Sequence, residues 1–168
     1  MKLRDVLVVV GLAALGAPLA FADGGGGGGG GGTDSGSGSV RASPEIDKAV
    51  AAIKAERYQD AIALLESHLA RERDDADGHN WLGYAYRKSG QLEPAFTAYK
   101  RALAIDPKHR GAHEYIGEAY LMAGQPEQAA IHLRALDKLC PWSCDQYRDL
   151  KRAIAAYSAG RPTAAISR

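Results

Sequence analysis

The chain has 168 residues, with 21 Lys and Arg against 20 Asp and Glu, so its formal net charge at pH 7 is +1. This balance gives no support for a nucleic-acid partner or for binding to an acidic membrane surface, because both favour a protein with a basic face. Acidic residues lie among basic neighbours, as in Arg71-Glu72-Arg73, which is typical of solvated helix surfaces.

Residues 1–22 are predicted to be a secretory signal. Lys2 and Arg4 precede the apolar run VLVVVGLAALG, and Ala20-Phe21-Ala22 fits the small-x-small cleavage rule. The run is roughly half of the ~20 apolar residues that a membrane-spanning helix needs. We therefore expect cleavage between Ala22 and Asp23, no stable membrane insertion afterwards and a periplasmic location. An uncleaved anchor is the alternative.

Residues 23–42 are predicted to be a flexible linker rich in Gly and Ser. Nine consecutive glycines, Gly24 to Gly32, are followed by TDSGSGS. Such a segment buries no apolar surface and loses much chain entropy when it is ordered. A phosphate-binding loop is excluded because no Lys followed by Ser or Thr adjoins the glycines.

Residues 43–75 are predicted to form a first pair of helices. Ser43-Pro44-Glu45 is typical of a helix start, and Glu56-Arg57-Tyr58 leads into the second helix. Apolar residues recur at three- and four-residue intervals, which indicates one apolar face on each helix. These residues are Ile46, Ala49, Val50, Ala52 and Ile53 in the first helix and Ala61, Leu64, Leu65 and Leu69 in the second.

Residues 76–109 and 110–143 carry one pattern twice, with a spacing of 34 residues. Leu82, Gly83, Tyr86, Gly90, Ala95, Tyr99 and Pro107 recur as Ile116, Gly117, Tyr120, Gly124, Ala129, Leu133 and Pro141. Ser89-Gly90 predicts a turn between two helices, because glycine adopts the left-handed conformation that often closes a helix. Asp106-Pro107 predicts the end of the second helix, because the residue before proline is disfavoured in helical geometry.

This pattern resembles the tetratricopeptide repeat, in which W-x2-L-G-x2-Y is followed by A-x3-F and then P. The resemblance implies an all-α fold, a short solenoid of three helix-turn-helix repeats. The first repeat, at residues 43–75, is degenerate, as expected of a terminal repeat whose outer face meets water. In the other two repeats, His79 and His113 stand where the family has Trp.

Residues 144–158 are predicted to form a capping helix over the last repeat. Tyr147, Leu150, Ile154 and Tyr157 share one side of this helix, and charged residues share the other. Residues 159–168 are predicted to be a disordered tail.

Cys140 and Cys144 frame the turn between the last repeat and the cap. In an exported protein, two cysteines most simply form a disulfide, because the compartment is oxidising. The alternatives are free thiols, or redox or copper-binding chemistry. A redox site normally has two residues between its cysteines beside a strand and helix. Here the spacing is three, and no strand is predicted nearby.

No other grouping of residues predicts catalysis, so we expect a non-enzymatic protein with no cofactor. His113-Glu114 does not continue into the HExxH zinc pattern. His79, His109 and His113 are the candidate ligands of a weak transition-metal site, but a lone imidazole is more often packed and hydrogen-bonded. We predict no metal site.

The resemblance implies a concave groove lined by the first helix of each pair, in which a partner peptide or helix lies. The predicted groove residues are Asn80, Tyr84, Arg87, Lys88, Glu114, Glu118, Leu121 and Met122, with Ile46, Val50 and Lys54 contributed by the first repeat. The alternative is that Tyr84 and Leu121 complete the packing between repeats.

We therefore predict an adaptor of the bacterial periplasm that binds an envelope protein during assembly. This setting rests on analogy with exported repeat proteins. The alternative function is a periplasmic thiol-redox or metal-handling accessory protein that uses Cys140 and Cys144. Self-association through the cap stays open as well.

Overall fold

A computed structural model describes residues 43–160, and all of its regular secondary structure within that range is α-helical. The all-α prediction is confirmed. The predicted signal and linker, and residues 161–168 of the predicted tail, lie outside the described residues. The helices are α1 (Pro44–Lys54), α2 (Tyr58–Arg71), α3 (Ala76–Lys88), α4 (Leu92–Ile105), α5 (Arg110–Met122), α6 (Pro126–Leu139) and α7 (Asp145–Ser158).

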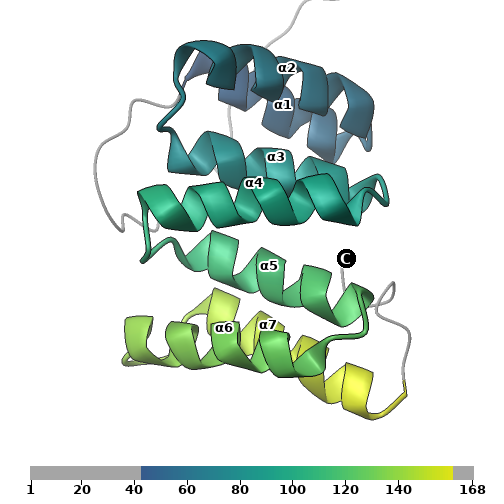
Figure 1. Cartoon of the computed structure of the whole chain (residues 1–168), viewed down its shortest axis with the longest axis vertical. Coiled ribbons are helices and arrows are strands. Elements are labelled where there is room, and N and C mark those ends of the chain that lie inside the picture. Colours follow the sequence, from purple (N-terminus) through teal and green to yellow (C-terminus); the bar gives the residue numbers. More distant parts are fainter. Residues whose placement is uncertain (1–42, 161–168) are drawn as a thin grey trace, which may run out of the picture. The chain divides into compact units, whose positions relative to one another are not determined.

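Successive helices pack as antiparallel pairs, α1 with α2, α3 with α4 and α5 with α6. The pairs follow one another in a row, and α7 closes the row by packing against α5 and α6 (Figure 1). This is the predicted short solenoid of three helix pairs with a capping helix. Within residues 43–160, no helix combines the length and the apolar character needed to cross a membrane.

Side-chain caps begin the first helix of each pair. Ser43, Asp75 and His109 each accept a hydrogen bond from a backbone amide two or three residues further on, at 3.3, 3.1 and 3.1 Å. Such caps satisfy amide groups that have no partner within the helix. The first helices of the three pairs therefore start at defined residues, which fixes the register of the face that they present.

Two glycines allow the helices to approach closely. A Cβ atom on Gly83 of α3 would lie 2.6 Å from the ring of Tyr99 on α4. A Cβ atom on Gly117 of α5 would lie 2.6 Å from Leu150 on α7. Both Tyr99 and Leu150 are fully buried. The glycine positions of the two repeats therefore hold α4 against α3 and the capping helix against α5.

The turns inside the helix pairs share a left-handed residue. Gly90 and Gly124 have φ angles of 82° and 73°. The equivalent residue of the first pair, 34 positions earlier, is Glu56, and its φ is 57°. A residue with a Cβ atom is strained in this conformation by about 1–2 kcal/mol. The first pair therefore carries strain at a position where glycine relieves it in the other two.

Replacing Glu56 tests this strain. Glu56→Gly is expected to raise the free energy of unfolding by about 1 kcal/mol, because glycine removes the Cβ clash at a positive φ. The matched change Gly90→Ala is expected to lower it by a similar amount. Urea denaturation followed by circular dichroism at 222 nm measures both. A Glu56→Gly variant that is less stable than the parent would contradict the backbone strain assigned to Glu56.

Candidate functional site

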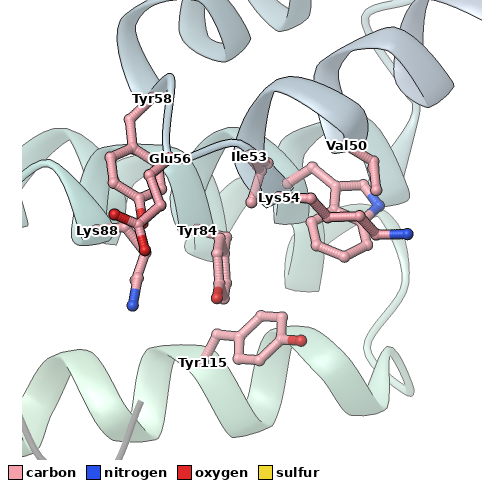
Figure 2. A pocket seen from close by; sticks show the side chains of 9 residues that line it. Val50, Ile53, Lys54, Glu56, Tyr58, Tyr84, Lys88 and Tyr115 are labelled. Carbon is pink, nitrogen blue, oxygen red and sulfur yellow. The ribbon is translucent and has the colours of Figure 1, made fainter. Parts of the chain in front are cut away.

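A cavity of about 320 Å³ opens on the face formed by the first helices of the repeats. It lies between α1 and the turn after it on one side and α3 and α5 on the other (Figure 2). Its lining residues are Val50, Ile53, Lys54, Glu56, Tyr58, Trp81, Tyr84, Lys88 and Tyr115. This set, called here the aromatic cavity, combines four aromatic and two aliphatic side chains with three charged ones.

Three of the aromatic rings contact one another edge to face. The ring centroids of Tyr84 and Tyr115 are 5.0 Å apart, and those of Trp81 and Tyr84 are 5.9 Å apart. Figure 2 shows Tyr84 pointing from α3 toward Tyr115 on α5. Trp81 and Tyr84 are neighbours because they lie three residues apart on one helix. Such rings present a large apolar surface that changes little in conformation when a ligand binds.

The charged side chains come from the ends of the first helices. Lys54 and Lys88 occupy equivalent positions of α1 and α3, 34 residues apart, and Glu56 lies in the turn after α1. Burial raises the pKa of Tyr58, and nearby Glu56 raises it further. Burial also raises the pKa of Tyr84, against the opposing effect of Arg87. Both hydroxyls therefore stay neutral at physiological pH.

Arg87 connects the two repeats behind these rings. The residue is 2% exposed, and its guanidinium forms an ion pair with Glu118 of α5, with 2.8 Å between the nitrogen and oxygen atoms. Its Nε atom donates to the hydroxyl of Tyr99 at 3.4 Å. The guanidinium carbon also lies 5.1 Å from the ring centroid of Tyr84 and 5.7 Å from that of Tyr115. Arg87 therefore supports the rings that line the aromatic cavity.

The structure divides the eight predicted groove residues into three groups. Tyr84 and Lys88 line the aromatic cavity, and Met122 is 39% exposed. The other five, Asn80, Arg87, Glu114, Glu118 and Leu121, are buried. This burial differs from the solvent-facing position that the lining of an open groove implies. Whether any of the eight contacts a partner stays a prediction.

Five residues that line the aromatic cavity were not predicted from the sequence as groove residues. Tyr58, Trp81 and Tyr115 were not assigned to the groove, and neither were Ile53 and Glu56. One signal was present, because Trp81 and Tyr115 are 34 residues apart and so occupy the same position of successive repeats. Comparison with the family's Trp position drew attention to His79 instead.

The three candidate metal-binding histidines have separate hydrogen-bond partners. His79 and His113 each donate through Nε2 to a backbone carbonyl, at 2.9 and 3.1 Å. His109 bonds through Nε2 to the carboxylate of Asp77 at 3.0 Å. Among residues 43–160, no three or more His, Cys, Asp or Glu side chains gather in a way that could hold a metal ion. These histidines fix helix starts and junctions.

Cys140 and Cys144 lie on either side of the turn between α6 and α7. Their Cα atoms are 5.5 Å apart, and their sulfur atoms are within bonding distance. The turn displays Trp142, which is 93% exposed, and contains Ser143 with a φ of 66°. The two cysteines therefore connect the last repeat to its cap at a sharp bend, away from the residues of the aromatic cavity.

Residues 83–124, from the middle of α3 to the turn after α5, match the family model described as TPR repeat. This segment carries the tetratricopeptide-repeat pattern. No curated protein matches the sequence. The match spans both glycines of the close helix approaches, Gly83 and Gly117, and both turn glycines, Gly90 and Gly124. It also includes Tyr84, Lys88 and Tyr115 of the aromatic cavity.

Solved structures with the same fold include three that are informative. The translocator chaperone SycD of Yersinia enterocolitica type III secretion superimposes with a TM-score of 0.63 and 17% identity, over 69% of this chain and 82% of SycD. The first TPR of Spaghetti (RPAP3), bound to the HSP90 peptide SRMEEVD, gives 0.60 and 17%, over 68% and 90%. The Sgt2 TPR domain of Aspergillus fumigatus gives 0.59 and 24%, over 71% and 86%. At these identities the likeness establishes the fold alone.

The ion pair between Arg87 and Glu118 is expected to contribute strongly to stability. Arg87→Met should lower the free energy of unfolding by about 3–5 kcal/mol, because it leaves the buried Glu118 carboxylate without its counter-charge. The matched control is Arg101→Met, which removes an exposed ion pair with Asp74 and should cost about 1 kcal/mol or less. Urea denaturation of both variants makes the comparison. Equal losses would contradict the structural role of Arg87.

Proposed function

We propose that the protein is a non-enzymatic adaptor that binds a segment of a partner protein in the aromatic cavity. The single observation that carries the proposal is the cavity itself, lined by Trp81, Tyr84 and Tyr115 on the face made by α1, α3 and α5. A preformed apolar pocket of this volume with a few polar groups at its edge is typical of a ligand site. Clustered aromatic residues are also typical of binding hot spots.

Two fold neighbours support a peptide as the ligand. SycD has been crystallised with a peptide of the translocator YopD, and the RPAP3 domain holds an HSP90 peptide. In the protein described here, the cavity has room for an apolar anchor side chain, and Lys54, Glu56 and Lys88 present both signs of charge at its edge. The proposed ligand is therefore an extended or helical segment with an apolar anchor and charged flanking residues.

The proposed setting is the periplasm or cell envelope. It is supported by the basic, apolar and small-residue pattern of residues 1–22 and by the Gly-rich segment that follows. It is also supported by the proximity of the two sulfur atoms, because disulfides persist in oxidising compartments. We propose a structural disulfide there. A thiol-redox function is not proposed, because the cysteines join two helices without the strand of a thioredoxin-type site within residues 43–160.

The state of the cysteines can be measured by mass spectrometry. The purified, exported protein is expected to gain two hydrogen atoms on reduction and to resist alkylation beforehand. Replacing both cysteines by Ala should lower the free energy of unfolding by roughly 2 kcal/mol, by the chain-entropy argument for a short loop. Two freely alkylated thiols in the native protein would refute the disulfide.

The binding proposal can be tested with a displayed library of random peptides, enriched on the full protein. Affinities of the selected peptides are then measured by the fluorescence of Trp81, using a Trp142→Phe background in which Trp81 is the sole tryptophan. Tyr84→Ala should weaken binding at least about tenfold, because removing a hot-spot aromatic residue typically costs 2 kcal/mol or more. Tyr84→Phe keeps the ring and should restore most of the affinity.

Ile131→Ala is the matched control. Ile131 is a large apolar residue that is 46% exposed on α6, and it does not line the aromatic cavity. Its removal should leave the peptide affinities unchanged, and circular dichroism should show that all three variants keep their helical content. If no peptide is enriched, or if Tyr84→Ala binds as well as the parent, the cavity is not the binding site.

A further inference from the structure

Glu114 is a buried acid without an ion-pair partner among the described residues. It lies on α5, is 8% exposed, and forms neither an ion pair nor a hydrogen bond through its side chain within the described part of the chain. The neighbouring acids differ from it in this respect. Each of them has an arginine partner: Glu118 pairs with Arg87, Asp145 with Arg148, and Asp149 with Arg152.

The surroundings of Glu114 disfavour its ionised form. Burial raises its pKa first, Glu118 and then Asp149 raise it further, and the result is a pKa of about 8. The charged groups that act on it are Arg87 from α3, Glu118 from α5 itself, and Asp149 and Asp145 from α7. Helices α4 and α6 also pack on α5, but they carry none of the charged groups that shift the pKa of Glu114 most. Glu114 therefore holds a proton at neutral pH unless a cation compensates its charge.

Glu114 is next to the aromatic cavity. It precedes Tyr115 in α5. Burial raises the pKa of Tyr115 and of Tyr84, and the nearby Glu114 raises both further. Both tyrosines line the cavity. Glu114 does not itself line the cavity, but Asp149 and Asp145 of α7 act on it, so it lies on the side of α5 toward which a segment continuing from the cavity to α7 would run. Neighbouring helices pack about 8–10 Å apart, and an extended chain covers this distance in roughly three residues.

We propose that Glu114 selects a Lys or Arg side chain in the bound segment, roughly three residues from the apolar anchor. This inference rests on the proposed adaptor function and specifies its ligand. On binding, the Glu114 carboxyl group releases its proton to solvent. The resulting carboxylate forms a buried ion pair with the cationic side chain of the ligand, so each binding event releases one proton. The other acids nearby are already paired with arginines, which leaves Glu114 as the acceptor for the ligand's cation.

The probes are the peptides selected on the cavity that contain a Lys near the anchor, and their analogues with norleucine in place of that Lys. The parent protein is expected to bind the Lys peptide at least about tenfold more tightly than the norleucine analogue at pH 8. In Glu114→Gln this ratio should fall to about one, with the affinity for the norleucine analogue kept. Glu127→Gln, which changes an exposed glutamate of α6, is the matched control and should keep the parent ratio.

Calorimetry supplies a readout that a structural role would not change. Binding of the Lys peptide at pH 7 should release about one proton from the parent, seen as a dependence of the heat on the buffer, and none from Glu114→Gln. Because ionised Glu114 is the form that binds, the affinity of the parent for this peptide should weaken about tenfold for each pH unit below 8. Glu114→Gln should show no such dependence.

The outcomes separate this inference from the adaptor function. Peptides that require Tyr84, yet bind equally well with Lys or norleucine, would overturn the role of Glu114 and leave the adaptor function standing. A Lys preference that persists in Glu114→Gln would overturn it as well. Loss of all Tyr84-dependent binding would overturn both proposals. Thermal unfolding at pH 7 checks that Glu114→Gln folds like the parent, as expected when one neutral side chain replaces another.

Discussion

Close contact between packed helices at glycine residues is the constraint on which the rest of the structure depends. Gly83 receives the ring of Tyr99, and Gly117 receives Leu150 of the capping helix. A single helix pair cannot cover its own apolar face, so each pair depends on the next for burial. Between the pairs, α3 and α5 lie near enough for Arg87 to reach Glu118 and for Tyr84 to meet Tyr115. The candidate site is thus a product of the packing between repeats.

The sequence predicted the helix pairs from their apolar periodicity and 34-residue spacing, the turn from Ser89-Gly90 and the first helix start from Ser43-Pro44-Glu45, because these depend on local patterns. It predicted the site less well. Projection along one helix shows which side chains share a face, but it does not show how closely the next helix covers that face. Arg87 and Glu118 were therefore assigned to an open groove, although they neutralise each other in the interior.

Residues that conflict with their surroundings gather around the aromatic cavity. Glu56 adopts a left-handed conformation that its equivalents reserve for glycine, Arg87 is a fully buried cation, and Glu114 is a buried acid without a partner. Glu56 and Glu114 each lower stability relative to a simpler residue at the same position, through the strained turn and the buried, unpaired acid. Arg87 is instead compensated by its ion pair with Glu118. Such conflicts concentrate at functional sites, since a sequence under selection for stability alone would remove them. Their common location supports the cavity as the site of binding.

This location also changes the interpretation of the first repeat. Its departures from the repeat pattern were explained as those of a terminal unit whose outer face meets water. The structure shows that α1 and its turn supply Val50, Ile53, Lys54 and Glu56 to the cavity. All four line a space bounded by α3 and α5, and Lys54 and Glu56 are exposed to solvent at its edge. The first repeat therefore differs from the others on its inner face too, and the proposed ligand binding offers a reason for this difference that a terminal position alone does not.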